Sequence, residues 1–94
     1  MALTLHQLEL FVAVAKHLNM TQMSREMHVS QSAISHQIKK LQLEFGKTFI
    51  QRNGRGVALT KDGANFLRNA KTVVSGVDEM YRKYAAKPRS AGKK

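Results

Sequence analysis

Amide, hydroxyl and amino groups gather on one side of a helix that we expect over residues 31–45. Gln31 can pair with adenine through one donor and one acceptor, and Ser35 can donate to or accept from several bases. Lys39, further along the same side, adds positive charge. Small and amide-bearing residues at the front of a helix, with lysines behind them, suit insertion into the major groove of DNA. The chemistry predicted for this segment is therefore hydrogen bonding to base edges.

The opposite side of the expected helix is apolar and would hold it on a hydrophobic core. Spacings of four, three and four residues place four side chains on one stripe: Ile34, Ile38, Leu41 and Phe45. Ser30 can cap this helix, and Gly46 can end it. Leu43 falls on the polar side without an apolar partner in the sequence, and a wing or a second subunit could cover it.

A shorter helix comes before this one and would make the pair a helix-turn-helix. We expect Thr21 to cap the shorter helix. Two methionines, Met23 and Met27, would face inward as adaptable core residues rather than form a metal site. His28 and Val29 would form the turn, with Val29 as its buried anchor.

A first helix is expected over about residues 5–17. Thr4 can cap this helix, and Gln7, three residues on, completes a capping box. Apolar residues recur along it at helical spacing, so we expect it to support the helix-turn-helix from behind.

A β-hairpin should follow the helix pair. Two short strand-like runs, over residues 48–52 and 56–59, flank an Asn-Gly pair, which is a strong local hairpin signal. Such a hairpin would form a wing, with Arg52 and Arg55 carrying positive charge to a phosphate. The simplest alternative is an ordinary hairpin turn without a ligand, and the segment lacks the frame of a P-loop.

A long final helix is expected from Lys61 towards residue 85, with Thr60 as its cap. Its apolar residues follow a coiled-coil pattern with spacings of four, three, four, three and four: Phe66, Ala70, Val73, Val77, Met80 and Tyr84. The simplest interpretation is one long core helix. We favour dimerisation, because the stripe continues past the point where so small a core should end. Pro88 ends any helix.

Length and composition limit the classes of protein. The 94 residues suffice for one small domain, and 43% of them are hydrophobic. With no Cys and no metal-binding pattern among the histidines, we expect neither a metal site nor a cofactor. No nucleophile motif frames the Ser, His and Asp residues, so we expect no enzyme. No apolar run is long enough to span a membrane, and we expect a cytoplasmic protein.

Positive charge is unevenly distributed along the chain. The formal net charge is +10, of which +6 lies in the acid-free last thirteen residues. Residues 31–61 hold six basic residues against one acid, and this cluster is the better indication of nucleic-acid binding. We expect a DNA-binding domain over residues 1–60, a linker helix over residues 61–86 and a disordered basic tail over residues 87–94.

One segment and the frame after it share an order of residues with a known family. Residues 29–41 read Val-Ser-Gln-Ser-Ala-Ile-Ser-His-Gln-Ile-Lys-Lys-Leu. The frame continues with Phe45-Gly46, Phe49-Ile50-Gln51-Arg52, Arg55 and Leu59-Thr60-Lys61-Asp62-Gly63. Together they resemble the DNA-binding part of LysR-type transcriptional regulators, over about residues 3–85.

The chain departs from that family pattern at a few positions. The usual residues are replaced at Met23, Ser24, Ser32, Gln42, Ile50 and Asp62. Ser32 makes the start of its helix less rigid than the usual Pro would. His36 stands where many members carry Arg, and its shorter side chain predicts guanine recognition that is weaker or dependent on pH.

The resemblance implies a mainly α fold, a winged helix-turn-helix of three helices plus a β-hairpin wing, followed by a long dimerisation linker helix. It implies a homodimer that binds an interrupted palindrome in double-stranded promoter DNA. By position, base contacts fall on Gln31, Ser32, Ser35, His36 and, from the wing in the minor groove, Arg55. Phosphate contacts fall on Thr21, Ser30, Gln37, Lys39 and Arg52.

The resemblance also implies a larger C-terminal domain that binds a small-molecule effector and is absent from these 94 residues. The chain would then be the N-terminal part of a longer regulator, or a naturally short relative. A tetramer in a full-length form and contact with RNA polymerase are compatible with the family.

Two other interpretations stay open at this point. A ModE-like winged-helix domain would share the architecture, although it usually lacks this recognition segment. A coiled-coil interaction module, in which the basic face is incidental, belongs to a different functional class. A specific complex with DNA, containing two chains per site, would separate the first interpretation from the module.

Overall fold

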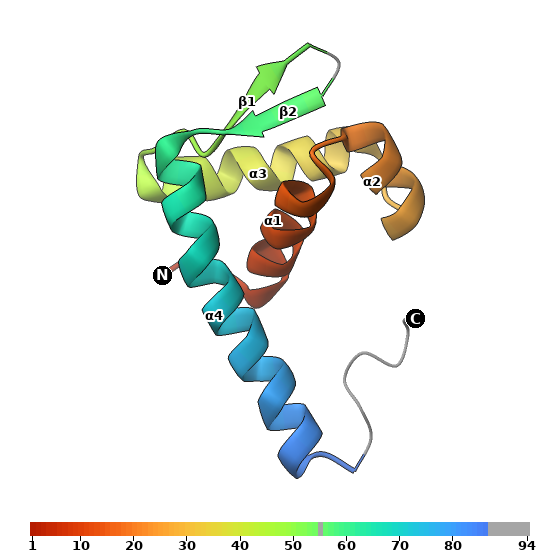
Figure 1. Cartoon of the computed structure of the whole chain (residues 1–94), viewed down its shortest axis with the longest axis vertical. Helices are drawn as coiled ribbons and strands as arrows, with labels where there is room; N and C mark the ends of the chain where they lie inside the picture. Colours follow the sequence, from red (N-terminus) through yellow and green to blue (C-terminus); the bar gives the residue numbers. More distant parts are fainter. Residues whose placement is uncertain (55, 87–94) are drawn as a thin grey trace.

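Four helices and a β-hairpin follow one another in the computed structural model, which describes residues 1–54 and 56–86. In chain order they are α1 (Leu5–His17), α2 (Met20–Met27), α3 (Gln31–Phe45), β1 (Ile50–Asn53), β2 (Gly56–Leu59) and α4 (Lys61–Tyr84). Figure 1 shows the hairpin over α3, with α4 running away from the rest of the domain. The expected winged helix-turn-helix followed by a long helix is confirmed. The predicted tail over residues 87–94 lies outside the described residues.

Three of the helices have the polar N-cap residues that the sequence predicts. Thr4 Oγ1 accepts from the Gln7 N–H at 3.1 Å, and Gln7 Oε1 accepts from the Thr4 N–H at 3.0 Å, which is the expected capping box. Ser30 and Thr60 cap α3 and α4, each accepting from the backbone N–H three residues on, at 3.1 and 2.9 Å. These bonds satisfy N–H groups that have no partner within the first helical turn.

The cap of α2 is Asn19, and the prediction of Thr21 is wrong. Asn19 Oδ1 accepts from the Gln22 N–H at 2.9 Å. The reason lies at the end of α1, where Leu18 takes the left-handed backbone conformation with a φ of 53°. The chain therefore turns at once, α2 begins at Met20, and Thr21 already lies within the helix.

The turn between α2 and α3 is held by its backbone. Val29, predicted to be buried, is 39% exposed, so that prediction is wrong. Its N–H donates to Ser24 O at 3.2 Å, and Ser24 Oγ donates to Val29 O at 2.5 Å. His28 supplies the reversal with a φ of 57°. Hydrogen bonds to the backbone thus anchor the turn in place of a buried side chain.

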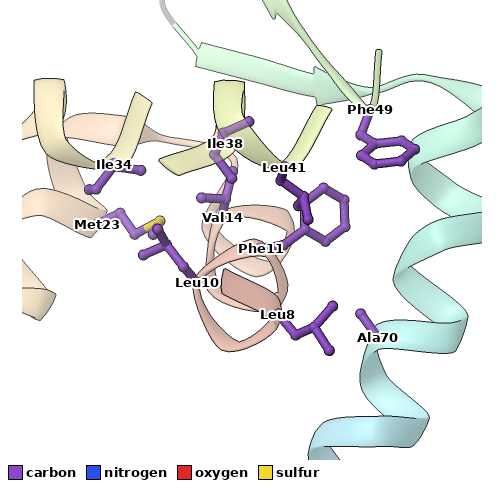
Figure 2. Packing of buried hydrophobic residues seen from close by; sticks show 10 residues of the cluster. All are labelled: Leu8, Leu10, Phe11, Val14, Met23, Ile34, Ile38, Leu41, Phe49 and Ala70. Carbon is purple, nitrogen blue, oxygen red and sulfur yellow. The ribbon is translucent and has the colours of Figure 1, made fainter. Parts of the chain in front are cut away.

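The hydrophobic core lies where α1 is enclosed by α2, α3, the residues before β1 and α4. Figure 2 shows the buried side chains Leu8, Leu10, Phe11, Val14, Met23, Ile34, Ile38, Leu41, Phe49 and Ala70. Towards α4, the ring centroid of Phe11 lies 5.8 Å from that of Phe49 and 5.2 Å from that of Phe66, both edge to face. This packing fixes α4 and the wing relative to α1.

The wing begins later than the sequence predicts. Thr48, expected in the strand, instead accepts at its carbonyl from Thr60 Oγ1 at 2.6 Å. Antiparallel pairing starts only at Ile50, which lies opposite Leu59, and it ends at Asn53. The two residues before β1 are therefore drawn into contacts with the neighbouring helices.

The start of α4 packs closely against the chain before β1. A Cβ atom on Gly63 would lie 2.0 Å from the carbonyl oxygen of Phe49. No side chain fits at that distance, so this position requires glycine.

Gln42 of α3 holds the start of the wing. Its Oε1 accepts from the N–H of Phe49 at 2.8 Å and from that of Ile50 at 3.1 Å, both partly buried. The family usually has Glu at this position, and a carboxylate would accept the same two bonds with added charge. The helical pattern of α3 places Gln42 next to the core but does not indicate which N–H groups it meets.

We expect Gln42→Ala to lower the free energy of unfolding by about 2–3 kcal/mol, because two partly buried N–H groups lose their acceptor. Gln42→Glu should be at least as stable as the parent. Urea denaturation followed by circular dichroism, at one protein concentration, measures both. Gln51→Ala, on an exposed side chain of β1, is the control. An unchanged midpoint for Gln42→Ala would show that these bonds contribute nothing to stability.

Candidate nucleic-acid interface

The helix α3 presents one side to the core and the other to solvent. Ile34, Ile38 and Leu41 are 0, 7 and 1% exposed. The predicted base-contacting side chains Ser32, Ser35 and His36, together with Gln31 and Lys39, are all exposed. The amphipathic pattern therefore orients α3 as expected, except that Phe45, predicted on the buried stripe, is 43% exposed at the end of the helix, where its ring centroid lies 5.2 Å from that of Phe66. Contact with bases stays a prediction.

A groove runs between α3 and the hairpin, with a volume of about 460 Å³. It brings together five side chains that the sequence singles out for DNA contact: Thr21, Gln31, Ser35, Lys39 and Arg52. Donors, acceptors and two positive charges thus line one open cleft. A cleft with this chemistry suits a polyanion with hydrogen-bonding edges.

Two of these side chains are already joined. Gln31 Nε2 donates to Thr21 Oγ1, and the distance between the two atoms is 3.2 Å. The bond links the first turn of α3 to the first turn of α2. The sequence places both residues on the polar face but does not predict this contact.

The remaining predicted residues of α3 lie apart from that groove. His36 and Gln37 line a smaller hollow of about 180 Å³ on another side of the helix, together with residues of α1 and α2. Gln37 Oε1 accepts from Nε2 of Gln7, which is only 8% exposed, at 3.3 Å. The Gln37 oxygen is thus bonded to α1, and its amide nitrogen can still donate to a phosphate.

Two serines meet at the start of α3. Ser30 Oγ caps the helix and lies 3.2 Å from Ser32 Oγ. Ser32 stands at the position where the family usually has Pro. The hydroxyl at this position is exposed and can donate or accept, so it can serve a base or a phosphate.

The wing is attached to the turn between α1 and α2. Leu18 O accepts from the Val57 N–H at 3.3 Å, and a Cβ on Gly56 would lie 2.7 Å from the same oxygen. Leu18 is thus a structural residue that sequence reasoning missed, because its left-handed conformation has no apolar or charge pattern. Arg52 is exposed on β1, whereas the predicted minor-groove contact, Arg55, lies outside the described residues.

The apolar stripe of α4 divides into two halves. Phe66 and Ala70 pack on the core of their own domain, where Ala70 is 2% exposed. The second half consists of half-buried Val77 and of Val73, Met80 and Tyr84, which are 47, 61 and 81% exposed. Figure 1 shows this half of α4 extending beyond α1. The exposed apolar side chains of this stripe therefore begin near residue 73.

Leu43 remains uncovered, at 72% exposed, so the wing does not shield it as considered from the sequence. His17, in contrast, has a structural partner, because its Nε2 lies 3.4 Å from Glu26 Oε1.

Among residues 1–54 and 56–86, no three His, Asp or Glu side chains come together to hold a metal ion. Within the same part of the chain, no helix is long and apolar enough to cross a membrane.

Curated relatives match most of this chain and a small part of their own length. The Escherichia coli (strain K12) glycine cleavage system transcriptional activator is 36% identical over 83 residues, which cover 88% of this chain and 27% of that protein. The RuBisCO operon transcriptional regulator of Allochromatium vinosum is 35% identical over 80 residues, covering 85% and 26%. The chain thus spans about a quarter of these relatives.

Solved structures are also similar to this fold. The BenM_DBD/benA site 1 DNA complex superposes with a TM-score of 0.80 at 31% identity, covering 86% of this chain and 94% of that one. The CbnR_DBD–DNA complex gives a TM-score of 0.75 at 32% identity, covering 90% and 100%. The family model described as "Bacterial regulatory helix-turn-helix protein, lysR family" matches residues 5–64, which are α1 to the first turn of α4. With this match over more than half its length, the chain belongs to the lysR family of bacterial regulatory helix-turn-helix proteins.

Proposed function

We propose that the chain uses its lysR-family DNA-binding domain to recognise a two-fold site in double-stranded promoter DNA as a homodimer, with α3 in the major groove and the wing at the minor groove. The observation that carries this proposal is the groove between α3 and the hairpin. Its lining combines amide, hydroxyl and cationic side chains from α2, α3 and β1. Similarity to domains solved as DNA complexes supports it independently.

Base recognition is assigned to the front of α3. Gln31 can pair with adenine, and Ser35, one turn further, can bond to several base edges. Ser32 and His36 are exposed on the same helix and extend the contact surface beyond the groove. Arg55 is proposed for the minor groove on the family resemblance alone. At these assigned contacts, discrimination would come from hydrogen bonds to base edges.

Phosphate contact is assigned to side chains around the groove. Lys39 of α3 and Arg52 of β1 both line the groove. Such contacts set affinity and register on the duplex but carry little sequence information. Thr21 in the groove, and Ser30 and Gln37 outside it, would add neutral hydrogen bonds to phosphates.

Dimerisation is assigned to the second half of α4. Exposed apolar side chains at helical spacing, Val73, Met80 and Tyr84, are costly in water and suit a second helix. One recognition helix contacts too few bases to select a genomic site, whereas two helices in fixed register read two half-sites. We therefore expect an interrupted palindrome, with a spacing set by the helix pair.

The remaining properties rest on the family and on the length of its members. Because the chain spans about a quarter of its relatives, we expect the whole regulator to carry a C-terminal domain that binds a small-molecule effector. A cytoplasmic location in a bacterium, no enzymatic activity, a tetrameric full-length form and contact with RNA polymerase belong to the same expectation.

A coiled-coil interaction module remains the alternative function, because the exposed stripe on α4 would serve it equally well. That function leaves the convergence of polar residues in the groove without a role. The DNA-binding proposal accounts for both surfaces.

A binding-site selection with the purified domain and random duplex DNA tests the proposal. We expect a two-fold enriched site bound by two chains at moderate salt, since two recognition helices act together. Mobility shift against competitor DNA and mass photometry measure specificity and stoichiometry. No enrichment over repeated rounds, with the protein folded, would overturn the proposal and favour the interaction module.

Lys39→Ala should weaken binding about equally for all sequences and reduce the slope of log affinity against log salt concentration by about 1, because one phosphate contact is lost. Fluorescence anisotropy over a range of salt concentrations measures the slope. Lys71→Ala, exposed on α4 away from the groove, is the matched control. A slope equal to that of the parent would make Lys39 an ordinary solvated lysine.

Met80→Glu should weaken dimerisation by roughly tenfold or more, because it places an unpaired carboxylate in an apolar helix seam. Sedimentation equilibrium gives the dimer dissociation constant, and circular dichroism verifies the fold. Ser75→Glu adds the same charge on the opposite side of α4 and should leave the dimer intact. Equal dissociation constants for the two variants would contradict this seam.

A further inference from the structure

The hydrogen bond between Thr21 and Gln31 crosses from one helix of the pair to the other. It joins two exposed side chains whose atoms, Gln31 Nε2 and Thr21 Oγ1, lie 3.2 Å apart at the edge of the groove. An exposed amide has no need of an internal partner, since water would satisfy it. A bond formed here between two candidate DNA contacts therefore invites a functional explanation.

We propose that Thr21 is a positioning residue that fixes the orientation of the Gln31 amide and thereby sets which base α3 recognises at that position. This inference rests on the proposed DNA-binding function and assigns to Thr21 a role beyond phosphate contact. Gln31 would touch the base, and Thr21 would act through Gln31.

The chemistry of the amide makes its orientation decisive. The last torsion of a glutamine side chain is broad and roughly two-fold, so the oxygen and the nitrogen of a free Gln31 exchange places easily. Adenine presents an acceptor beside a donor in the major groove, and the amide matches it in one orientation only. In the other orientation, two donors face each other, and so do two acceptors.

The bond to Thr21 selects one orientation when the Thr21 hydroxyl donates its own hydrogen to a phosphate, because Oγ1 can then only accept and Gln31 must present Nε2 to it. A hydrogen of Nε2 is given to Thr21 Oγ1, so Oε1 and the second hydrogen of Nε2 remain for a base. The Gln31 side chain is then partly ordered before DNA binds, so binding loses less conformational entropy.

Both partners are themselves held in place. Thr21 is β-branched, which restricts its χ1 torsion, and it follows the first residue of a helix capped by Asn19. Gln31 is the first residue of α3, which is capped by Ser30. While Thr21 Oγ1 accepts from Gln31, its own hydrogen can still be donated to a phosphate. One hydroxyl would then couple backbone contact to base recognition.

A role limited to phosphate contact predicts a different result on removal of the hydroxyl. Loss of a phosphate contact lowers affinity almost equally for every sequence. Loss of the orienting bond lowers the preference at a single base position. The two roles are therefore distinguishable by base preference, whatever the change in overall affinity.

The test compares Thr21→Val, which removes the hydroxyl and keeps the shape, with Thr21→Ser, which keeps the hydroxyl. Dissociation constants are measured on the selected duplex and on duplexes with each base pair substituted, and Gln31→Ala identifies the position that Gln31 reads. At that position we expect Thr21→Val to reduce the preference by about five- to tenfold, within the range of one bidentate pair. Thr21→Ser should retain most of the preference, and preferences at other positions should not change.

A double-mutant cycle completes the test. In the Gln31→Ala background, Thr21→Val should no longer alter any base preference, because the group that it orients is gone. Thermal melts verify that each variant is folded, which the exposure of both side chains favours.

Two results would overturn the inference while leaving the proposed function intact. One is an equal loss of affinity on all duplexes with Thr21→Val, and the other is a Gln31→Ala variant with no altered position. Failure of the selection to enrich any site would instead overturn the proposed function itself.

Discussion

Burial of one side of α3 is the constraint on which the rest of the structure depends. Ile34, Ile38 and Leu41 lie in the core against α1, which keeps the helix from rotating about its axis. Its outward face is thereby defined, and Ser35 and Lys39 meet solvent only because the aliphatic side chains cannot. An interface that reads base edges needs such a rigid support, since errors of an ångström lose hydrogen bonds.

The wing and α2 depend on the same helix through polar contacts. Gln42 bonds to the start of β1, and the carbonyl of Leu18 holds β2 to the turn between α1 and α2. The groove is therefore bounded on both sides by elements fixed to the core. Its walls belong to segments far apart in sequence, and they meet because α1 and α3 pack together.

The two halves of α4 lie in different environments, one on the core and one exposed to solvent. In the proposed function, the exposed half binds a second copy of the chain. The first half of α4 completes the core through Phe66 and Ala70, so its direction is fixed by the domain. Its second half carries apolar side chains that the described residues of the same chain do not cover. A partner bound there would be oriented relative to α3, because α4 is one continuous helix whose first half packs on the same core as α3.

The sequence by itself determined the elements and the family: helical spacing located α3 and α4, Ser30 and Thr60 marked their starts, and the recognition segment identified the domain. These features are local or periodic, so they can be recognised from the sequence without a structure. It misplaced the cap of α2 and the burial of Val29, because left-handed residues leave no periodic signal. Only the tertiary structure decided the polar partners, such as Thr21 with Gln31 and Gln37 with Gln7. Those pairs depend on how helices cross and which rotamers the crossing admits, and these are properties of packing that a linear pattern does not contain.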